Sequence, residues 1–251
     1  MSAQQLNIDT IANNLANVNT TGYKAQRAEF EDMVYQTLRS SGATSSGSTA
    51  APMAMQIGLG SKFSANAMNN NQGPMQSTGN PFDMAIQGDG FFQVQMTDGS
   101  TAYTRDGSFK RDATGVLVTS DGYHVLPEIT IPEGATSVAV SASGAVTGTL
   151  PGQSTPTNFG QITLAVFANP AGLTRMGQNL FQAGGASGDP KVGNPTENGS
   201  GALQTGFLEG SNVQVVDEMV RMITAQRSYE INSKAIQTAD EMLNTINGIK
   251  R

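Results

Sequence analysis

The residues that most often carry out chemistry in proteins are few in this chain and stand apart from one another. His124 is the only histidine and there is no cysteine, so a catalytic dyad or a metal site built on these side chains has no second member. Asp98, Asp106, Asp112 and Asp121 fall in expected turns, and their spacing differs from that of a calcium-binding loop. We therefore expect no catalytic, cofactor-binding or metal-binding residues.

Two further motifs have a simpler interpretation than a functional one. The glycine-rich stretch at 87–92 reads "QGDGFF", but a strand pattern follows it, whereas a phosphate loop leads into a helix N-terminus. The tripeptides at 19–21 and 198–200 match the glycosylation pattern, which is common by chance. We expect a turn at the first motif and give the tripeptides no functional weight.

Composition excludes several classes of protein. The chain has 251 residues and a net charge of −6, which argues against the clustered lysines and arginines of a nucleic-acid-binding surface. Aromatic residues make up 6% and tryptophan is absent, so one large aromatic core is not expected. No stretch approaches the roughly 20 apolar residues of a membrane span. No conventional signal peptide is visible either, so export would use another route.

The N-terminal segment has the apolar spacing of a helix. Ile8, Ile11, Leu15 and Val18 follow one another at intervals of three, four and three, which places them on one stripe. A helix is expected to end at residues 20–22, with Gly22 in the left-handed conformation.

A second helix is predicted after this turn, because Phe30, Val34 and Leu38 recur at intervals of four. The polar, glycine-containing stretch 40–52 that follows is expected to be flexible or extended.

The C-terminal segment predicts a long helix. Ser211 or Asn212 is the expected N-cap, and Asp217 and Glu218 suit the positive end of the helix dipole. An unbroken series at intervals of three and four then favours packing against another helix. Its members are Met222, Ala225, Tyr229, Asn232, Ile236, Ala239, Leu243 and Ile246.

The middle of the chain predicts short antiparallel strands. Residues 91–126 alternate β-favouring runs with Asp-Gly pairs at 98–99, 106–107 and 121–122, and Asp-Gly accepts the positive φ angles of hairpin turns. Further strands are expected in 129–132, 137–150 and 161–167, and a long loop in 183–201.

The expected fold is therefore α+β, with long N- and C-terminal helices that pair as a coiled coil and an inserted antiparallel β-rich domain. Residues 1–39 and 209–251 form the predicted helical core domain, residues 40–75 an extended or flexible connection, and residues 76–208 the β-rich outer domain.

The outer face of the N-terminal helix is almost free of charge, since Asp9 is the only ionised side chain from Met1 to Tyr23. A helix beside identical copies of itself meets its own charges repeatedly, and neutral amides pair with their copies without that repulsion. Burial of both helices within one monomer is the alternative. The predicted helix–helix and intersubunit contacts are Ile8, Ile11, Asn13, Asn14, Leu15, Asn17, Val18, Met222, Tyr229, Asn232, Ile236, Leu243 and Ile246.

Four separate blocks of sequence resemble the bacterial flagellar rod and hook proteins, in that family's order. They read "IANNLANVNTTGYKAQRAEFEDMVYQTLR" (11–39), "AIQGDGFFQV" (85–94), "YTRDGSF" (103–109) and "EMVRMITAQRSYEINSKAIQTADEML" (218–243). Within the family, "FEDMVYQTLR" followed by "QIGLGSK" (56–62) most resembles distal rod subunits, with hook and proximal rod subunits as near alternatives. Relatives usually carry a few more helical turns before the position of Met1.

The resemblance implies a structural subunit of a hollow helical tube that transmits motor torque to the hook. It implies further copies, proximal rod and hook proteins, the surrounding basal-body rings and the type III export apparatus as partners, and a periplasmic location in the basal body. No enzyme activity and no cofactor are implied. A surface binding module, such as an adhesin, is the alternative from a different class.

Overall fold

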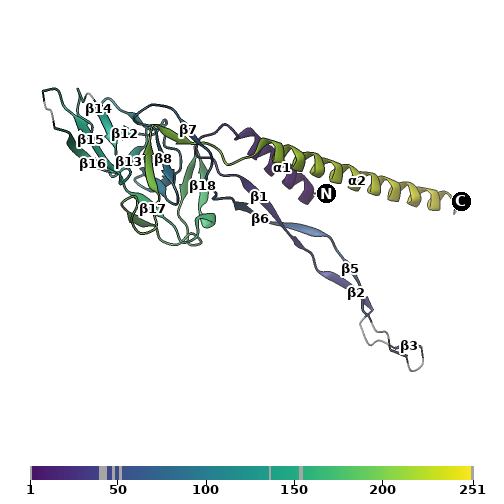
Figure 1. Ribbon diagram of the computed structural model, residues 1–251. Helices are drawn as coiled ribbons and strands as arrows, with labels where there is room; N and C mark the ends of the chain where they lie inside the picture. Colours follow the sequence, from purple (N-terminus) through teal and green to yellow (C-terminus); the bar gives the residue numbers. More distant parts are fainter. Residues whose placement is uncertain are drawn as a thin grey trace. The chain divides into compact units, whose positions relative to one another are not determined.

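The computed structural model describes residues 2–39, 44–46, 49–50, 53–135, 137–152 and 155–249. The chain divides into two compact units (Figure 1). The helical unit comprises Met1–Asn14, Gln26–Ala67 and Val216–Arg251, and the β-rich unit comprises Leu15–Ala25 and Met68–Val215. An α+β fold with one helix at each end of the chain and a β-rich domain is confirmed.

The N-terminal helix α1 spans Ser2–Ala16. The helix is followed by hydrogen-bonded turns, in the first of which the Val18 N–H donates to the Leu15 carbonyl at 3.3 Å. Gly22 has the predicted left-handed conformation, with a φ of +67°. The predicted helix end at 20–22 is wrong, because α1 already ends at Ala16. Val18 of the predicted stripe therefore follows the helix rather than belonging to it.

The C-terminal helix α2 spans Val215–Ile249, 35 residues, and carries Asp217 and Glu218 in its first turn as expected. The predicted N-cap is wrong, because α2 begins three residues after Asn212. The side chains of Ser211 and Asn212 bind elsewhere: the Ser211 hydroxyl accepts the Val213 N–H at 3.3 Å, and Asn212 accepts the Ala25 N–H at 2.7 Å.

The second predicted helix is wrong, because residues 26–39 form strands. In the helical unit, β1 (Gln26–Asp32) pairs with β6 (Ser61–Met68), and β2 (Tyr35–Arg39) pairs with β5 (Met55–Gly58). Residues four apart share one face of a strand as well as one face of a helix, so the spacing of Phe30, Val34 and Leu38 fits both.

A short pair, β3 (Thr44–Ser46) with β4 (Thr49–Ala50), lies between β2 and β5 in the sequence. Where it is described, the predicted flexible or extended stretch 40–52 is thus extended. The prediction for 40–43, 47–48 and 51–52 lies outside the described residues.

The β-rich unit is built around one nine-stranded antiparallel sheet (Figure 1). Its path runs β11-β12-β13-β9-β10-β19-β18, and β17 pairs with both β9 and β20. The strands are β9 (Phe91–Gln95), β10 (Thr101–Thr104), β11 (Lys110–Arg111), β12 (Leu117–Val118), β13 (His124–Leu126), β17 (Leu164–Val166), β18 (Thr174–Gly177), β19 (Leu180–Gln182) and β20 (Lys191–Gly193). A 3-10 turn, Pro170–Gly172, precedes β18.

Smaller sheets complete the unit. One has three strands, β14 (Ser137–Val140), β15 (Ala145–Thr149) and β16 (Thr157–Gln161). Two pairs join early to late strands: β7 (Met75–Ser77) with β22 (Phe207–Glu209), and β8 (Met84–Gln87) with β21 (Ala202–Thr205).

Two sequence predictions for this unit need correction. Residues 129–132 contain only an isolated bridge between Thr130 and Val116 rather than a strand. The predicted loop 183–201 includes β20, which pairs with β17. Residues 129–132 and β20 are both short stretches, and pairing partners from elsewhere in the chain decide whether such stretches form strands.

The three Asp-Gly pairs have two different roles. Gly99 and Gly122 have φ angles of +82° and +89° and close the β9–β10 and β12–β13 hairpins, as predicted. The hairpin predicted at Asp106-Gly107 is wrong, because β10 pairs with β9 and β19 while β11 pairs with β12. At Gly107 a Cβ atom would lie 1.6 Å from the Met84 carbonyl oxygen, so close backbone approach, not turn geometry, requires glycine there.

The β-rich unit has two separate apolar clusters, which contain the adjacent residues Phe92 and Phe91 of β9. The larger contains Phe92 and Phe109, whose rings meet edge to face at 5.0 Å. The smaller surrounds Phe91, which meets Phe167 and Phe181 edge to face. Adjacent residues of β9 thus point to opposite faces of the sheet and hold both clusters.

Candidate functional site

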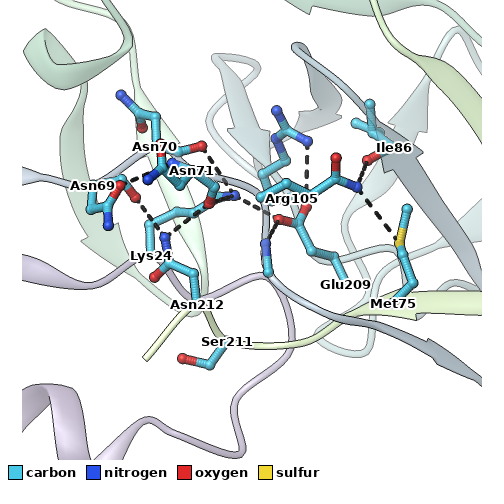
Figure 2. Close-up of polar contacts among 12 residues, drawn as sticks. Lys24, Asn69, Asn70, Asn71, Met75, Ile86, Arg105, Glu209, Ser211 and Asn212 are labelled. Carbon is cyan, nitrogen blue, oxygen red and sulfur yellow. Dashed lines mark hydrogen bonds and ion pairs between the residues drawn. The ribbon is translucent and has the colours of Figure 1, made fainter. Parts of the chain in front are cut away.

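The most concentrated polar chemistry in the described residues is a buried ion cluster in the β-rich unit, made by Lys24, Arg105 and Glu209 (Figure 2). Their side chains are 1%, 5% and 1% exposed. Lys24 Nζ lies 2.6 Å from Glu209 Oε1, and Arg105 Nη1 lies 3.3 Å from Glu209 Oε2. One carboxylate therefore pairs with two cations that come from distant parts of the sequence.

Backbone groups add hydrogen bonds to each member of the ion cluster, although Arg105 Nε is buried without a partner among the described residues. Lys24 Nζ also donates to the Asn71 carbonyl at 2.9 Å, and Glu209 Oε1 accepts the Gly73 N–H at 2.9 Å. Arg105 Nη2 donates to the Gly88 carbonyl at 2.8 Å. A buried charge is tolerated only when it is paired and hydrogen-bonded, and this arrangement meets that condition for each member.

Burial sets the electrostatics of the two cations. Desolvation lowers the pKa of the Lys24 ammonium, against the opposing attraction of Glu209. Burial lowers the pKa of the Arg105 guanidinium for the same reason. The Glu209 carboxylate offsets part of this cost of burial for both cations.

A second polar clamp lies next to the ion cluster (Figure 2). The Asn212 side chain accepts the Ala25 N–H at 2.7 Å and donates to the carbonyls of Asn69 and Asn71, at 2.9 Å each. Asn69 N–H in turn donates to the Ala25 carbonyl at 2.8 Å. One amide side chain thus joins three backbone segments of the β-rich unit.

Arg175 holds the same N-terminal turn from another side. Its guanidinium lies over the rings of Tyr23 and Phe181, 5.0 and 5.5 Å from their centroids, and it donates to the Lys24 carbonyl. Burial lowers the pKa of this guanidinium. A planar cation between two aromatic faces adds to the packing of the turn.

None of these arrangements contains the elements of a catalytic site. In the described part of the chain, no group of three His, Asp or Glu residues is placed to hold a metal ion. The described helices include none that is long and apolar enough to cross a membrane. The side chains of the ion cluster are instead used to join segments, which is a structural role.

The predicted contact residues of α1 and its following turn divide by burial. Ile11 and Asn14 are buried, Asn13 is exposed, and the others are partly buried: Ile8, Leu15, Asn17 and Val18. In the helical unit, the Asn14 side chain accepts the Gln26 N–H at 2.9 Å and donates to the Gln26 carbonyl at 2.7 Å. The Asn14 side chain thus forms hydrogen bonds within the chain, to both backbone groups of Gln26, the first residue of β1.

Replacement of Asn14 by Ala is expected to destabilise the helical unit by about 1–3 kcal/mol, because both backbone groups of Gln26 lose a buried partner. Thermal unfolding followed by circular dichroism at helical wavelengths measures this change. The matched control is Asn13→Ala, one residue earlier and exposed. Equal effects of the two substitutions would show that the amide of Asn14 has no special role.

The predicted contact residues of α2 are mostly open to solvent. Met222 is partly buried, whereas Tyr229, Asn232, Ile236, Leu243 and Ile246 are exposed. The exposed fractions of Ile236, Leu243 and Ile246 are 50%, 59% and 62%. The described residues therefore leave an apolar row uncovered along the second half of α2.

Sequence reasoning missed the ion cluster and the Asn212 clamp. The one visible signal was Lys24, the first cationic side chain of the chain, after a stretch in which only Asp9 is ionised. Nothing in a single sequence pairs it with Glu209, which lies 185 positions away.

Comparison with known proteins identifies relatives along the whole chain. Residues 1–24 match the family described as "Flagella basal body rod protein". Residues 85–148 match "Flagellar hook protein FlgE/F/G D1 domain", and residues 204–249 match "Flagellar basal body rod FlgEFG protein C-terminal".

Several relatives have the name "Flagellar basal-body rod protein FlgG", among them the following three. The protein from Borreliella burgdorferi is 51% identical over 100% of this chain and 96% of its own length. The protein from Agrobacterium fabrum is 48% identical over 98% of this chain and 94% of its own length. The protein from Bacillus subtilis is 44% identical, with the same coverage of 98% and 94%.

Proposed function

The chain belongs to the flagellar basal-body rod protein family and is similar over its whole length to proteins named FlgG. We therefore propose that it works as a subunit of the distal rod. It is a structural protein of the flagellar basal body and not an enzyme. We propose that copies assemble head to tail into a hollow helical tube, which transmits motor torque to the hook.

The observation that carries this proposal is the uncovered apolar row of α2. Tyr229, Ile236, Leu243 and Ile246 repeat at helical spacing and are exposed. Contiguous exposed apolar rows mark interaction sites in soluble proteins, and heptad rows become stable when a partner covers them. We propose that these rows, together with α1, form the coiled-coil inner layer of the tube.

The strand ribbon of the helical unit supports the same proposal. Val34, Leu38, Met53 and Ile57 are more than half exposed, and a two-stranded ribbon is at best marginally stable alone in water. Contact with neighbouring copies would cover these side chains and stiffen the wall of the tube.

The proposed partners follow from the position in the flagellum. We propose that the tube joins proximal rod proteins at one end and hook proteins at the other, inside the basal-body rings in the periplasm. Delivery through the type III export apparatus belongs to the same proposal.

A substitution in the uncovered row tests the function. The double variant Ile236→Asp, Leu243→Asp is expected to abolish swimming and rod formation, because two carboxylates in a desolvated contact repel each other and lose the apolar contact. The control variant Ile236→Val, Leu243→Met keeps the row apolar and should swim. Electron microscopy of basal bodies from a strain lacking the native gene measures the rod directly.

Two outcomes contradict the proposal. Complete rods built from the Asp variant would show that the row is not an assembly contact. If instead cells lacking the whole protein still build rods and swim, the protein is not a rod subunit. A surface binding module would also keep its ligand binding after deletion of α2.

A further inference from the structure

A groove of about 420 Å³ opens on the helical unit, between α1, β1 and the first turns of α2. Thr10 and Ile11 line it from α1, Ala28 from β1, and Thr224 and Ala225 from α2. All of these residues belong to one compact unit. The groove is large enough for several side chains of another helix.

Three hydroxyls of the groove are satisfied within their own helices, whereas one buried carboxylate oxygen is not. The hydroxyls of Thr10, Thr224 and Ser228 each donate to a carbonyl four residues earlier, at 2.8–2.9 Å, so these residues present methyl or methylene groups. Glu218 is only 6% exposed, and its Oε2 atom has no hydrogen-bond partner in the structure. Its other oxygen lies 3.5 Å from Arg221. The groove therefore needs one donor or cation from elsewhere.

A second row of small and apolar side chains runs along the exposed half of α2. Its members repeat at intervals of four and three and are all exposed: Ile231, Ala235, Thr238, Met242 and Thr245. Each directly precedes one member of the helical series predicted from the sequence, here called the first row: Asn232, Ile236, Ala239, Leu243 and Ile246. The two rows therefore lie about 100° apart around the helix. The hydroxyls of Thr238 and Thr245 donate to helix carbonyls at 2.9 Å, which leaves their methyl groups to face a partner.

We propose that the groove of one copy receives this second row from another copy of the same chain. The inference rests on the proposed function, since it specifies one contact by which rod subunits join. The first row remains available for other helices, so each α2 has two neighbours on adjacent sides.

Charge supports a second copy as the occupant. Arg27, Arg221 and Glu218 line the groove and give it a net charge of +1. On α2, Glu230, Lys234 and Glu241 each directly precede a member of the second row, and their net charge is −1. Opposite net charges therefore face each other, and Lys234, the only cation among residues 229–249, supplies the donor that Glu218 Oε2 needs.

This contact is heterologous, because the groove of one subunit binds a different surface patch of the next subunit, not the same groove. Such a contact repeats from subunit to subunit and generates an open helical filament unless the rotation closes. Both surfaces belong to the helical unit, so each copy can donate its α2 to one neighbour and accept that of another.

Engineered disulfides test the contact without background, because the native chain has no cysteine. In a double variant, Thr224→Cys and Thr238→Cys, the two cysteines are about 21 Å apart along one helix, too far for a bond within the chain. Oxidation of rods isolated from a strain lacking the native gene is expected to give a ladder of trimers and longer oligomers on a non-reducing gel. Each single-cysteine variant should remain monomeric on the same gel.

The matched control combines Thr224→Cys with Asp240→Cys. Residue 240 lies two positions after Thr238 on α2 and is turned from it by about 200° around the helix axis. This control should give no ladder. The inference is overturned if rods form and the strain swims but the Thr224/Thr238 variant gives no ladder, or if the control gives an equal one. A wild-type chain that is absent from isolated rods would instead overturn the proposed function.

Discussion

Replacement of Glu209 by Gln is expected to lower the free energy of unfolding of the β-rich unit by about 3–5 kcal/mol, the typical cost of removing one partner from a buried ion pair. The amide keeps the shape of the carboxylate but not its charge. Lys24 and Arg105 would then both be buried without an anion at 2.6–3.3 Å. Urea unfolding followed by circular dichroism measures the change.

A control carboxylate separates burial from charge. Glu31 lies 3.2 Å from Lys62 at the surface, with a side chain that is 56% exposed, and water screens such pairs. Glu31→Gln should leave the unfolding midpoint unchanged. If Glu209→Gln also left the unfolding midpoint unchanged, water would reach the ion cluster in solution and the cluster would not hold the segments together.

The substitution Gly107→Ala is expected to destabilise the β-rich unit by about 3 kcal/mol or more, because overpacking against rigid backbone is relieved only by moving that backbone. The added Cβ atom would lie 1.6 Å from the Met84 carbonyl oxygen and 2.7 Å from its carbon. Met84 starts β8 and is fully buried. The movement would therefore disturb the larger apolar cluster, and differential scanning calorimetry should show a lower Tm.

The Asp-Gly pair at 98–99 provides a matched control in the same sheet. At Gly99 a Cβ atom would meet nothing within 4 Å, although φ is +82°. Gly99→Ala should therefore cost only the left-handed conformation, about 1–2 kcal/mol. A cost at Gly107 no larger than that at Gly99 would contradict a steric role for Gly107.

The parts of the fold that could be predicted are those with long, local signals. The series from Met222 to Ile246 predicted α2, and the stripe from Ile8 to Leu15 predicted α1, because several turns of consistent spacing leave few alternatives. The three apolar positions Phe30, Val34 and Leu38 did not suffice to predict a helix, since an interval of four fits a strand and a helix alike. There the pairing of β1 with β6 and of β2 with β5 decided the structure.

The candidate site was less predictable than the fold. Asn14 was expected to contact other copies because it is a neutral amide, yet its side chain satisfies Gln26 in the same chain. Lys24, Arg105 and Glu209 meet through long-range pairing of segments that no local pattern specifies. Assembly of rod subunits through the rows of α2, by contrast, stays a prediction that rests on residues visible in the sequence.

The way Glu209 and Asn212 join the N-terminal turn to its neighbours has a mechanical consequence. A pull on residues 22–25 would strain several bonds together: Gly22 N–H to the Glu209 carbonyl, Ala25 N–H to Asn212, and the ion pair of Lys24. Bonds that share a force yield only when all of them stretch, whereas bonds opened one by one unzip under a weak pull. This junction therefore suits the load-carrying subunit that we propose.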